Sequence, residues 1–316
     1  MAQKSTPVIF IIGPTAAGKT RLAVALAQRF SGEIVNADSR QVYRHMDIGT
    51  AKPTPQERAQ APHHLLDLLD PGQDFSLGSI VSLARAQIQR IHEENKVPIV
   101  TGGTGQYVFG LLEGWQVPEV PPDPAFRESK QQEAERLGGQ VLYHELQGID
   151  PERAAELDPR NVRRVIRALE IHRASRRLPS GFPRRASPVS NPLVIGLGLA
   201  RDTLYQRIDS RVDGMMAGGF LDEVRGLAQM GYSMGKGPLA SPGYRELGQH
   251  LAGEIDLPEA VQRTKFQTHR LARRQGTWFK AGDPRITWLD ADHPDLDEQT
   301  GDHVGRFLAS LPAVVK

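Results

Sequence analysis

The order of apolar and polar residues predicts strands that alternate with helices along the first hundred residues. Residues 8–12 form an uninterrupted apolar run, which is typical of a strand buried on both faces. Helical periodicity follows at 19–30 and 80–94, and shorter strand-like runs occupy 33–37 and 97–100. This alternation indicates an α/β fold, with a parallel sheet flanked by helices.

Polar or glycine-rich segments follow each of these three predicted strands. They begin at Gly13, at Asp38 and at Thr101. The carboxyl ends of parallel strands meet at one edge of a sheet, and ligands bind beyond that edge. We therefore expect the three segments to contribute to one site.

A helical insertion is predicted inside this α/β domain. A proline-rich stretch at 117–124 leaves the sheet, the pattern at 125–177 is helical, and a loop at 179–192 is rich in Pro, Ser and Gly. Strand-like runs at 193–197 and 285–289 indicate that the chain returns to the sheet. The expected organisation is a core of residues 1–116 and 193–316 with an insertion at 117–192.

Composition narrows the function classes. The chain has no cysteine, which excludes disulfides and thiolate metal sites, and no apolar run long enough to span a bilayer. We expect a cytoplasmic protein without a membrane partner. The net charge is only +2, yet residues 151–190 carry ten arginines against four acidic residues, and 263–280 carry six cations and no acid. Such segments fit a polyanionic partner, although solvated helix faces would explain them equally well.

The strongest motif is the segment from Gly13 to Thr20, which has the G-x4-G-K-T pattern of a phosphate-binding P-loop. Backbone N–H groups of such a turn hold phosphate oxygens, the lysine adds a positive charge, and the hydroxyl of Thr20 is a ligand for Mg²⁺. Together with the parallel sheet it predicts a P-loop NTPase-like fold. The motif identifies a bound phosphate ester but not the reaction. Its members are Gly13, Pro14, Thr15, Ala16, Ala17, Gly18, Lys19 and Thr20.

Other segments allow more than one interpretation. Asp38 fits a Mg²⁺ ligand, a catalytic base or a helix cap, because Asp is a preferred capping residue. The turn at 101–105 fits a ligand-binding loop or a simple tight turn, and Arg245 fits a phosphate clamp or a surface arginine. For His63 and His64 we expect a structural role, since neighbouring histidines rarely face one metal ion and no third ligand is near.

Taken in order, these segments resemble the tRNA dimethylallyltransferase family, also called isopentenyl-diphosphate:tRNA transferases. The similarity extends over most of the chain, and the set of motifs is more specific than any one of them. The similar segments are GPTAAGKT at 13–20, NADSRQVY at 36–43, MDIGTAKP at 46–53, PHHLLD at 62–67, GGTGQY at 102–107, RRVIRALE at 163–170, GYRE at 243–246 and the stretch from Thr268 to Trp278.

The resemblance implies roles for individual residues. Asp38 would be the general base, Thr104 would contact the transferring centre, and Arg245 would stabilise the leaving pyrophosphate, with Mg²⁺ as cofactor at Thr20. The residues implied to contact tRNA are Asp38, Ser39, Arg40, Gln41, Thr104, Arg127, Arg163, Arg164, Val165, Ile166 and Arg167. Gln106, His269 and Arg273 depart from the usual family pattern, which affects individual contacts but not the catalytic set.

The implied reaction transfers dimethylallyl from dimethylallyl diphosphate to N6 of adenosine 37, just 3′ of the tRNA anticodon, by a monomeric enzyme. Three other functions remain open from the residues alone. They are a small-molecule kinase that uses ATP on the same loop, an isopentenyltransferase acting on free adenylates, and an RNA-binding protein without catalysis. The basic insertion argues against the free-nucleotide enzyme.

Overall fold

The computed structural model describes residues 6–73, 75–118, 120–182 and 188–311. The chain divides into two compact units, one of residues 1–113 and 188–316 and the other of residues 114–187. Arg184 and Arg185 of the first basic segment, and Glu119 of the proline-rich connector, lie outside the described residues.

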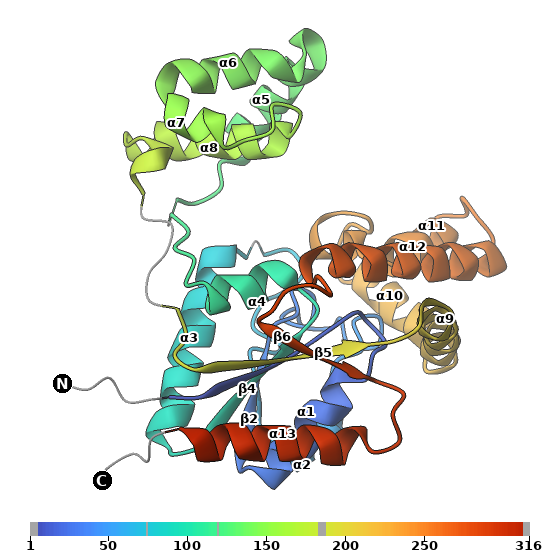
Figure 1. Cartoon of the computed structure of the whole chain (residues 1–316). Helices are drawn as coiled ribbons and strands as arrows, with labels where there is room; N and C mark the ends of the chain where they lie inside the picture. Colours follow the sequence, from blue (N-terminus) through green and yellow to red (C-terminus); the bar gives the residue numbers. More distant parts are fainter. Residues whose placement is uncertain (1–5, 74, 119, 183–187, 312–316) are drawn as a thin grey trace. The chain divides into compact units, whose positions relative to one another are not determined.

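The first unit is built on a six-stranded sheet in the order β3-β2-β4-β1-β5-β6, with every neighbouring pair parallel (Figure 1). The α/β fold and parallel sheet predicted from the sequence are confirmed. Each predicted strand is present within a residue or two of its expected ends, and the two-residue strand β3 was not predicted. The strands are β1 (Val8–Ile12), β2 (Gly32–Asn36), β3 (His63–His64), β4 (Val97–Gly102), β5 (Pro192–Gly198) and β6 (Ile286–Asp290).

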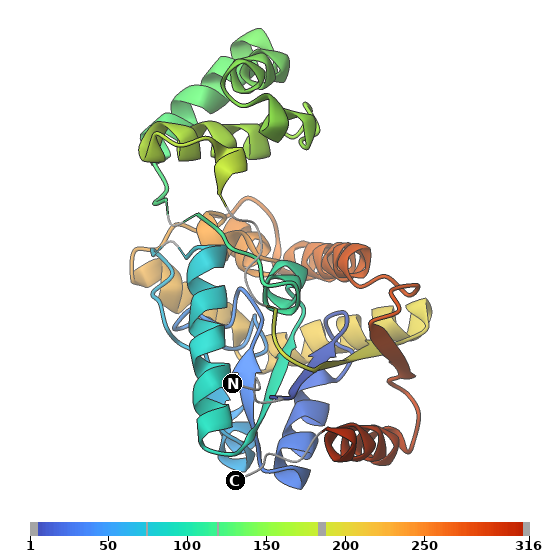
Figure 2. The ribbon, with the colours of Figure 1, turned by 60° about the vertical axis from the view of Figure 1, so that its left-hand side comes forward.

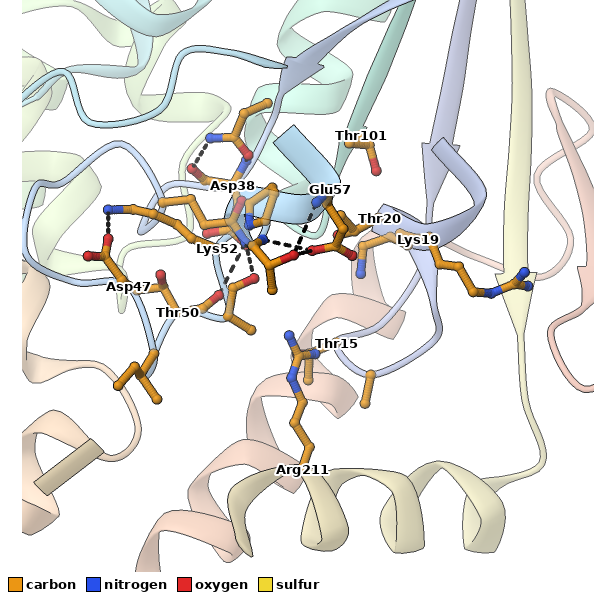
Figure 3. Close-up of a pocket in the computed structure, with 18 of the residues that line it drawn as sticks. Thr15, Lys19, Thr20, Asp38, Asp47, Thr50, Lys52, Glu57, Thr101 and Arg211 are labelled. Carbon is orange, nitrogen blue, oxygen red and sulfur yellow. Dashed lines mark hydrogen bonds and ion pairs between the residues drawn. The ribbon is translucent and has the colours of Figure 1, made fainter. Parts of the chain in front are cut away.

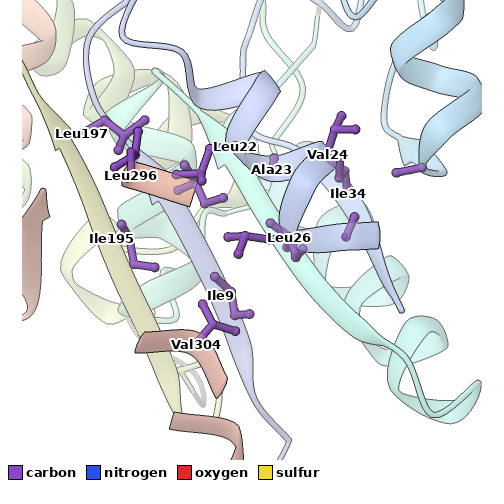
Figure 4. Packing of buried hydrophobic residues seen from close by; sticks show 14 of the residues in the cluster. Ile9, Leu22, Ala23, Val24, Leu26, Ile34, Ile195, Leu197, Leu296 and Val304 are labelled. Carbon is purple, nitrogen blue, oxygen red and sulfur yellow. The ribbon is translucent and has the colours of Figure 1, made fainter. Parts of the chain in front are cut away.

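Helices cover both faces of this sheet, α1 and α13 on one and α3 and α4 on the other, as Figures 1 and 2 show from two directions. Their bounds are α1 (Lys19–Arg29), α2 (Pro55–Gln60), α3 (Leu77–Glu93), α4 (Gly105–Leu112) and α13 (Leu296–Ser310). The fully buried Ile9 and Ile195 of the sheet share one apolar cluster with Leu22 of α1 and Val304 of α13 (Figure 4). Burial on both faces explains why the central strands are uninterrupted apolar runs.

A group of helices follows β5 in the chain, and α9 and α12 of this group pack against each other. They are α9 (Arg201–Ala217), α10 (Phe220–Gln229), the 3-10 helix η2 (Gly237–Ala240), α11 (Tyr244–Leu251) and α12 (Leu257–Trp278). Two of them, α9 and α12, supply side chains to the cavity described below. Among the described residues no helix is both long and apolar enough to cross a membrane.

The secondary structure elements described in the second unit are all helices, and the unit has its own core. Leu142 and Leu146 are fully buried there with Val165. The carboxyl group of Glu170 is also buried, and it accepts hydrogen bonds from the guanidinium groups of Arg127 and Arg167. The elements are α5 (Pro124–Leu137), α6 (Gly139–Ile149), α7 (Pro151–Ala155), α8 (Val162–Ser175) and η1 (Pro179–Gly181).

Candidate active site

The predicted phosphate-binding loop connects β1 to α1 at the carboxyl end of the sheet. Gly13 at the end of β1 has φ 145°, and a Cβ there would lie 2.7 Å from the carbonyl oxygen of Leu197. Gly18, at φ 85°, turns the chain into α1, whose first residue is Lys19. The Nζ atom of Lys19 donates to the carbonyl oxygen of Pro14 at 2.7 Å, so the ammonium group lies over the loop.

A cavity of about 1700 Å³ opens beside this loop (Figure 3). Thr15, Lys19 and Thr20 line it on the side of the loop, Asp38 lines it from the end of β2, and Arg211 enters it from α9. Its volume exceeds the usual range for a small-molecule site, roughly 300–1000 Å³. The cavity therefore has room for a phosphate ester together with a second group.

The charges around this cavity are buried and mixed in sign. Burial lowers the pKa of Lys19 to about 8, and the nearby Asp38 carboxylate acts in the opposite direction. Burial likewise lowers the pKa of Arg211 below its usual range, again opposed by Asp38. Lys19 and Arg211 are thus two desolvated cations beside one carboxylate, Asp38. A bound anion of higher charge, such as a diphosphate, would stabilise their charged forms.

Hydrogen bonds at the ends of β2 and β4 fix Asp38 and Thr104 near each other. One carboxylate oxygen of Asp38 accepts from the backbone N–H of Arg40 at 2.8 Å. The hydroxyl of Thr104 accepts from the backbone N–H of Ser39 at 3.0 Å and donates to the Ser39 hydroxyl at 3.3 Å. No helix begins at Asp38, so its carboxylate stabilises a turn rather than capping a helix. No described residue forms a hydrogen bond with the second carboxylate oxygen, which is therefore available to a substrate.

The side chain of Gln275 on α12 ties together two of the three predicted segments. Its Oε1 accepts from the backbone N–H of Thr15 at 2.8 Å, and its Nε2 donates to the carbonyl oxygen of Gly103 at 3.1 Å. Gln275 is buried and lines the cavity. Neither its role nor that of Arg211 was predicted, because residues so distant in sequence become neighbours only through the packing of α9 and α12.

The structure places Arg245 outside the set of residues that line this cavity. Its Nε and Nη2 atoms donate to Oε1 of Glu246, at 2.9 and 2.7 Å. Several cations line the cavity, and Arg211 of α9 is one of them. The role implied for Arg245 stays a prediction.

The residues expected to contact tRNA fall into different environments. Gln41 donates through Nε2 to the carbonyl oxygens of Thr50 and Ala51, so it supports a neighbouring loop. Ser39 and Arg40 are partly exposed beside Asp38. In the helical unit, Val165 and Ile166 are buried in the core, which removes their side chains from any direct contact.

The arginines of the helical unit also differ from one another. Arg127 and Arg167 pair with the buried Glu170. Burial would raise the pKa of this carboxyl group, but the two arginines and the Asp123 N–H outweigh it and lower the pKa. Arg163 and Arg164 are exposed, and neither forms an ion pair with any residue that the structure describes. Of the four arginines in this unit expected to contact tRNA, these two have no ion-pair partner among the described residues and can bind an external anion.

The residues present are compatible with Mg²⁺. Thr20 and Asp38 both line the cavity. Within the described ranges no three His, Asp or Glu side chains gather into a metal site of their own. Mg²⁺ commonly keeps several waters and binds through one or two protein oxygens together with substrate phosphates. The Thr20 hydroxyl group, together with substrate phosphates and waters, fits a site of this kind.

His63 and His64 form the short strand β3. Nε2 of His64 lies 2.6 Å from the Glu33 carboxylate, and Nδ1 of His63 lies 2.8 Å from the carbonyl oxygen of Ala61. Both histidines thus bind groups of the protein itself, as expected of residues with a structural role. His63 also lines the cavity, which the sequence did not indicate.

Comparison with known proteins gives a consistent result. The model of the IPP transferase family matches residues 41–282, and that of the isopentenyl transferase family matches residues 6–67. The chain is 50% identical to a tRNA dimethylallyltransferase of Roseiflexus castenholzii over 92% of its length and 94% of the relative's. It is 47% identical to the Chloroflexus aurantiacus enzyme of the same name, over 93% and 99% of the two chains.

Solved structures agree with this assignment. The chain resembles the tRNA isopentenylpyrophosphate transferase of Bacillus halodurans, with a TM-score of 0.71, 38% identity and 97% of both chains covered. It also resembles a eukaryotic dimethylallyltransferase acting on tRNA, with a TM-score of 0.82 and 30% identity over 98% of this chain and 81% of the other. The chain therefore belongs to the IPP transferase family of tRNA dimethylallyltransferases, as its sequence motifs predicted.

Proposed function

We propose that this chain transfers the dimethylallyl group from dimethylallyl diphosphate to N6 of adenosine 37 in tRNA and releases diphosphate. The observation that carries the proposal is the arrangement around the cavity, where a phosphate-binding loop and Arg211 face the Asp38 carboxylate. The anionic leaving group would bind to the loop and Arg211, and the Asp38 carboxylate would act as the base.

The acceptor nitrogen explains the need for this arrangement. The exocyclic amine of adenine is a poor nucleophile, because its lone pair is delocalised into the ring. As the C1–O bond of the allylic donor breaks, its electron pair goes to the diphosphate and C1 gains carbocation character. N6 then forms the new bond to C1, and the free oxygen of Asp38 accepts the proton that N6 loses. Such general-base assistance contributes about 10²–10⁴-fold.

The greater task is to stabilise negative charge on the departing diphosphate. Lys19, Arg211 and backbone N–H groups of the loop would provide this stabilisation, since Lys19, Arg211 and the loop residues Ala16, Gly18 and Thr20 all line the cavity. The N–H of Thr15 already donates to Gln275, so the other N–H groups of the loop would hold the phosphates. Mg²⁺ held by Thr20 would add charge neutralisation. The Thr104 hydroxyl accepts a hydrogen bond from the N–H of Ser39, the residue after Asp38. Thr104 would in this way keep the Asp38 carboxylate close to the transferring centre.

The tRNA would reach this site with its adenine extruded from the anticodon loop, where unstacking costs least. Ser39 and Arg40 lie beside the proposed base, and Arg163 and Arg164 are exposed on the helical unit. We expect a monomer that acts on tRNA in the cytoplasm.

The proposal is tested by mass analysis of tRNA nucleosides after reaction with dimethylallyl diphosphate. We expect dimethylallyl-adenosine from wild type, and at least ~100-fold less from Asp38→Ala, with tRNA binding retained. Asp302→Asn, which changes an exposed carboxylate paired with Arg29, is the matched control and should react normally. Phosphoryl transfer from ATP without prenylated tRNA would instead indicate the kinase, and full turnover by Asp38→Ala would remove Asp38 from its role.

A further inference from the structure

The loop of residues 46–52 forms a wall of the cavity. Ile48, Thr50 and Ala51 all line it, and Figure 3 shows Thr50 on the side that faces Thr15 and Arg211. Ala51 has φ 48°, and its N–H donates to the carbonyl oxygen of Ile48 at 2.9 Å, which closes a tight turn. The shape of this wall therefore depends on what holds the turn.

A carboxylate outside the cavity holds this loop by its backbone. Oε2 of Glu223 on α10 accepts from the N–H groups of Asp47 and Ile48, at 2.8 and 2.6 Å. Oε1 accepts from the N–H of Gly49 at 3.1 Å and from the hydroxyl of Tyr244 at 2.7 Å. Four donors, three of them consecutive backbone groups, thus meet on one negative side chain. Hydrogen bonds to an ionised acceptor are about twice as strong as neutral ones.

Neighbouring groups remove the freedom of the loop to move toward or away from α10. A Cβ at Gly49 would come closer than 3.0 Å to ring atoms of Phe220 and Tyr244, so the backbone is pressed against both rings. On the other edge, Nε2 of Gln41 donates to the carbonyl oxygens of Thr50 and Ala51. The loop is therefore held by its N–H groups on one edge and by its carbonyl groups on the other.

Glu223 itself does not line the cavity. Any effect of this side chain on the reaction must pass through the loop that it holds. We propose that Glu223 is a positioning residue, which fixes the 46–52 wall and thereby sets the affinity of the site for the allylic diphosphate donor. This inference rests on the proposed function, because it takes the cavity to be the donor site.

The test separates the donor from the tRNA. Glu223→Gln keeps the length of the side chain but removes its charge and turns an NH₂ group toward backbone donors. We expect the KM for dimethylallyl diphosphate to rise at least about tenfold, with kcat and the KM for tRNA within about threefold of wild type. Tyr244→Phe removes one of the four donors and should raise the donor KM by a smaller factor. Asp222→Asn, on the same helix and exposed, should match wild type.

Two further measurements make each outcome decisive. Calorimetric binding of dimethylallyl diphosphate without tRNA should show the same order of affinities, and thermal unfolding reports stability separately. A Glu223→Gln protein that melts at lower temperature but binds the donor like wild type would overturn the proposal, as would an equal rise in both KM values. If wild type fails to prenylate tRNA, the proposed function falls, while the binding comparison still decides the role of Glu223.

Discussion

Arg211 and Arg245 differ in what their guanidinium groups face. Arg211 is half-buried in the cavity wall, and desolvation lowers its pKa. The guanidinium group of Arg245 instead donates two hydrogen bonds to Oε1 of Glu246. We expect Arg211→Ala to lower kcat/KM for the donor by about 10²–10³-fold, the usual loss when one group that stabilises developing charge is removed. Arg245→Ala should leave donor kinetics within about twofold. Steady-state kinetics with varied donor decide between the two residues, and a large loss for Arg245→Ala would support the role that the family motif implies.

Lys19 carries a dependence on pH that can be measured directly. Burial, the largest influence on this group, lowers its pKa to about 8. The ammonium form therefore dominates below pH 8 and is lost as the pH rises through that value. We expect the affinity for dimethylallyl diphosphate to fall between about pH 7 and 9.5 in wild type. The Lys19→Arg protein should bind the donor more weakly at pH 7. Its affinity should then fall little as the pH rises, because the guanidinium group stays charged. An identical decline in both proteins would assign the titration to another group.

These residues show how far sequence reasoning reaches. Lys19 was predicted from the G-x4-G-K-T pattern after the first strand, and Asp38 from its place after the second. Parallel strands bring the segments at their carboxyl ends together. Arg211 and Gln275 lie within the long helices α9 and α12, where nothing in the sequence distinguishes them from surface residues. Which face of α9 or α12 meets the cavity is decided by tertiary packing, so their roles needed the structure.

At the scale of elements, helix α12 packs directly onto the second glycine-rich turn. A Cβ at Gly103 would come closer than 3.0 Å to Nε2 of Gln275, and one at Gly105 would come as close to the ring of Trp278. Neither glycine has a positive φ. They are required for close approach of the helix rather than for an unusual backbone, a distinction that the sequence pattern alone left open as a tight turn.

This packing predicts opposite effects of two glycine substitutions. Gly105→Ala should lower the free energy of unfolding by about 1–3 kcal/mol, because the added methyl group overlaps the Trp278 side chain. Gly276→Ala is the control within α12, where nothing lies near the added carbon, and it should raise stability by about 0.5–1 kcal/mol through helix propensity. Denaturant unfolding measures both. Equal stability of the Gly105 variant and wild type would show that α12 yields easily at this contact.

At the scale of the whole molecule, the chain divides into two units with separate cores. The proline-rich stretch predicted the departure from the sheet, and the observed helical unit of 114–187 is close to the expected insertion of 117–192. What the sequence did not distinguish is which arginines of this unit are internal. Arg127 of α5 and Arg167 of α8 both neutralise the Glu170 carboxylate of α8, which has 1% of its side chain exposed.

That distinction changes how the unit is expected to bind tRNA. Each phosphate neutralised by an external cation adds about 0.7–0.9 to the slope of log affinity against log salt. Arg163→Gln with Arg164→Gln should therefore weaken tRNA binding and reduce this slope by up to about two, with unfolding unchanged. Arg127→Gln with Arg167→Gln should instead lower the unfolding temperature, since it leaves Glu170 buried without its cations. Binding titrations at several salt concentrations, beside thermal unfolding, compare the two pairs. The opposite assignment of effects would mean that the Glu170 pairs open when tRNA binds, so that Arg127 and Arg167 become the contacts that the family motif implied.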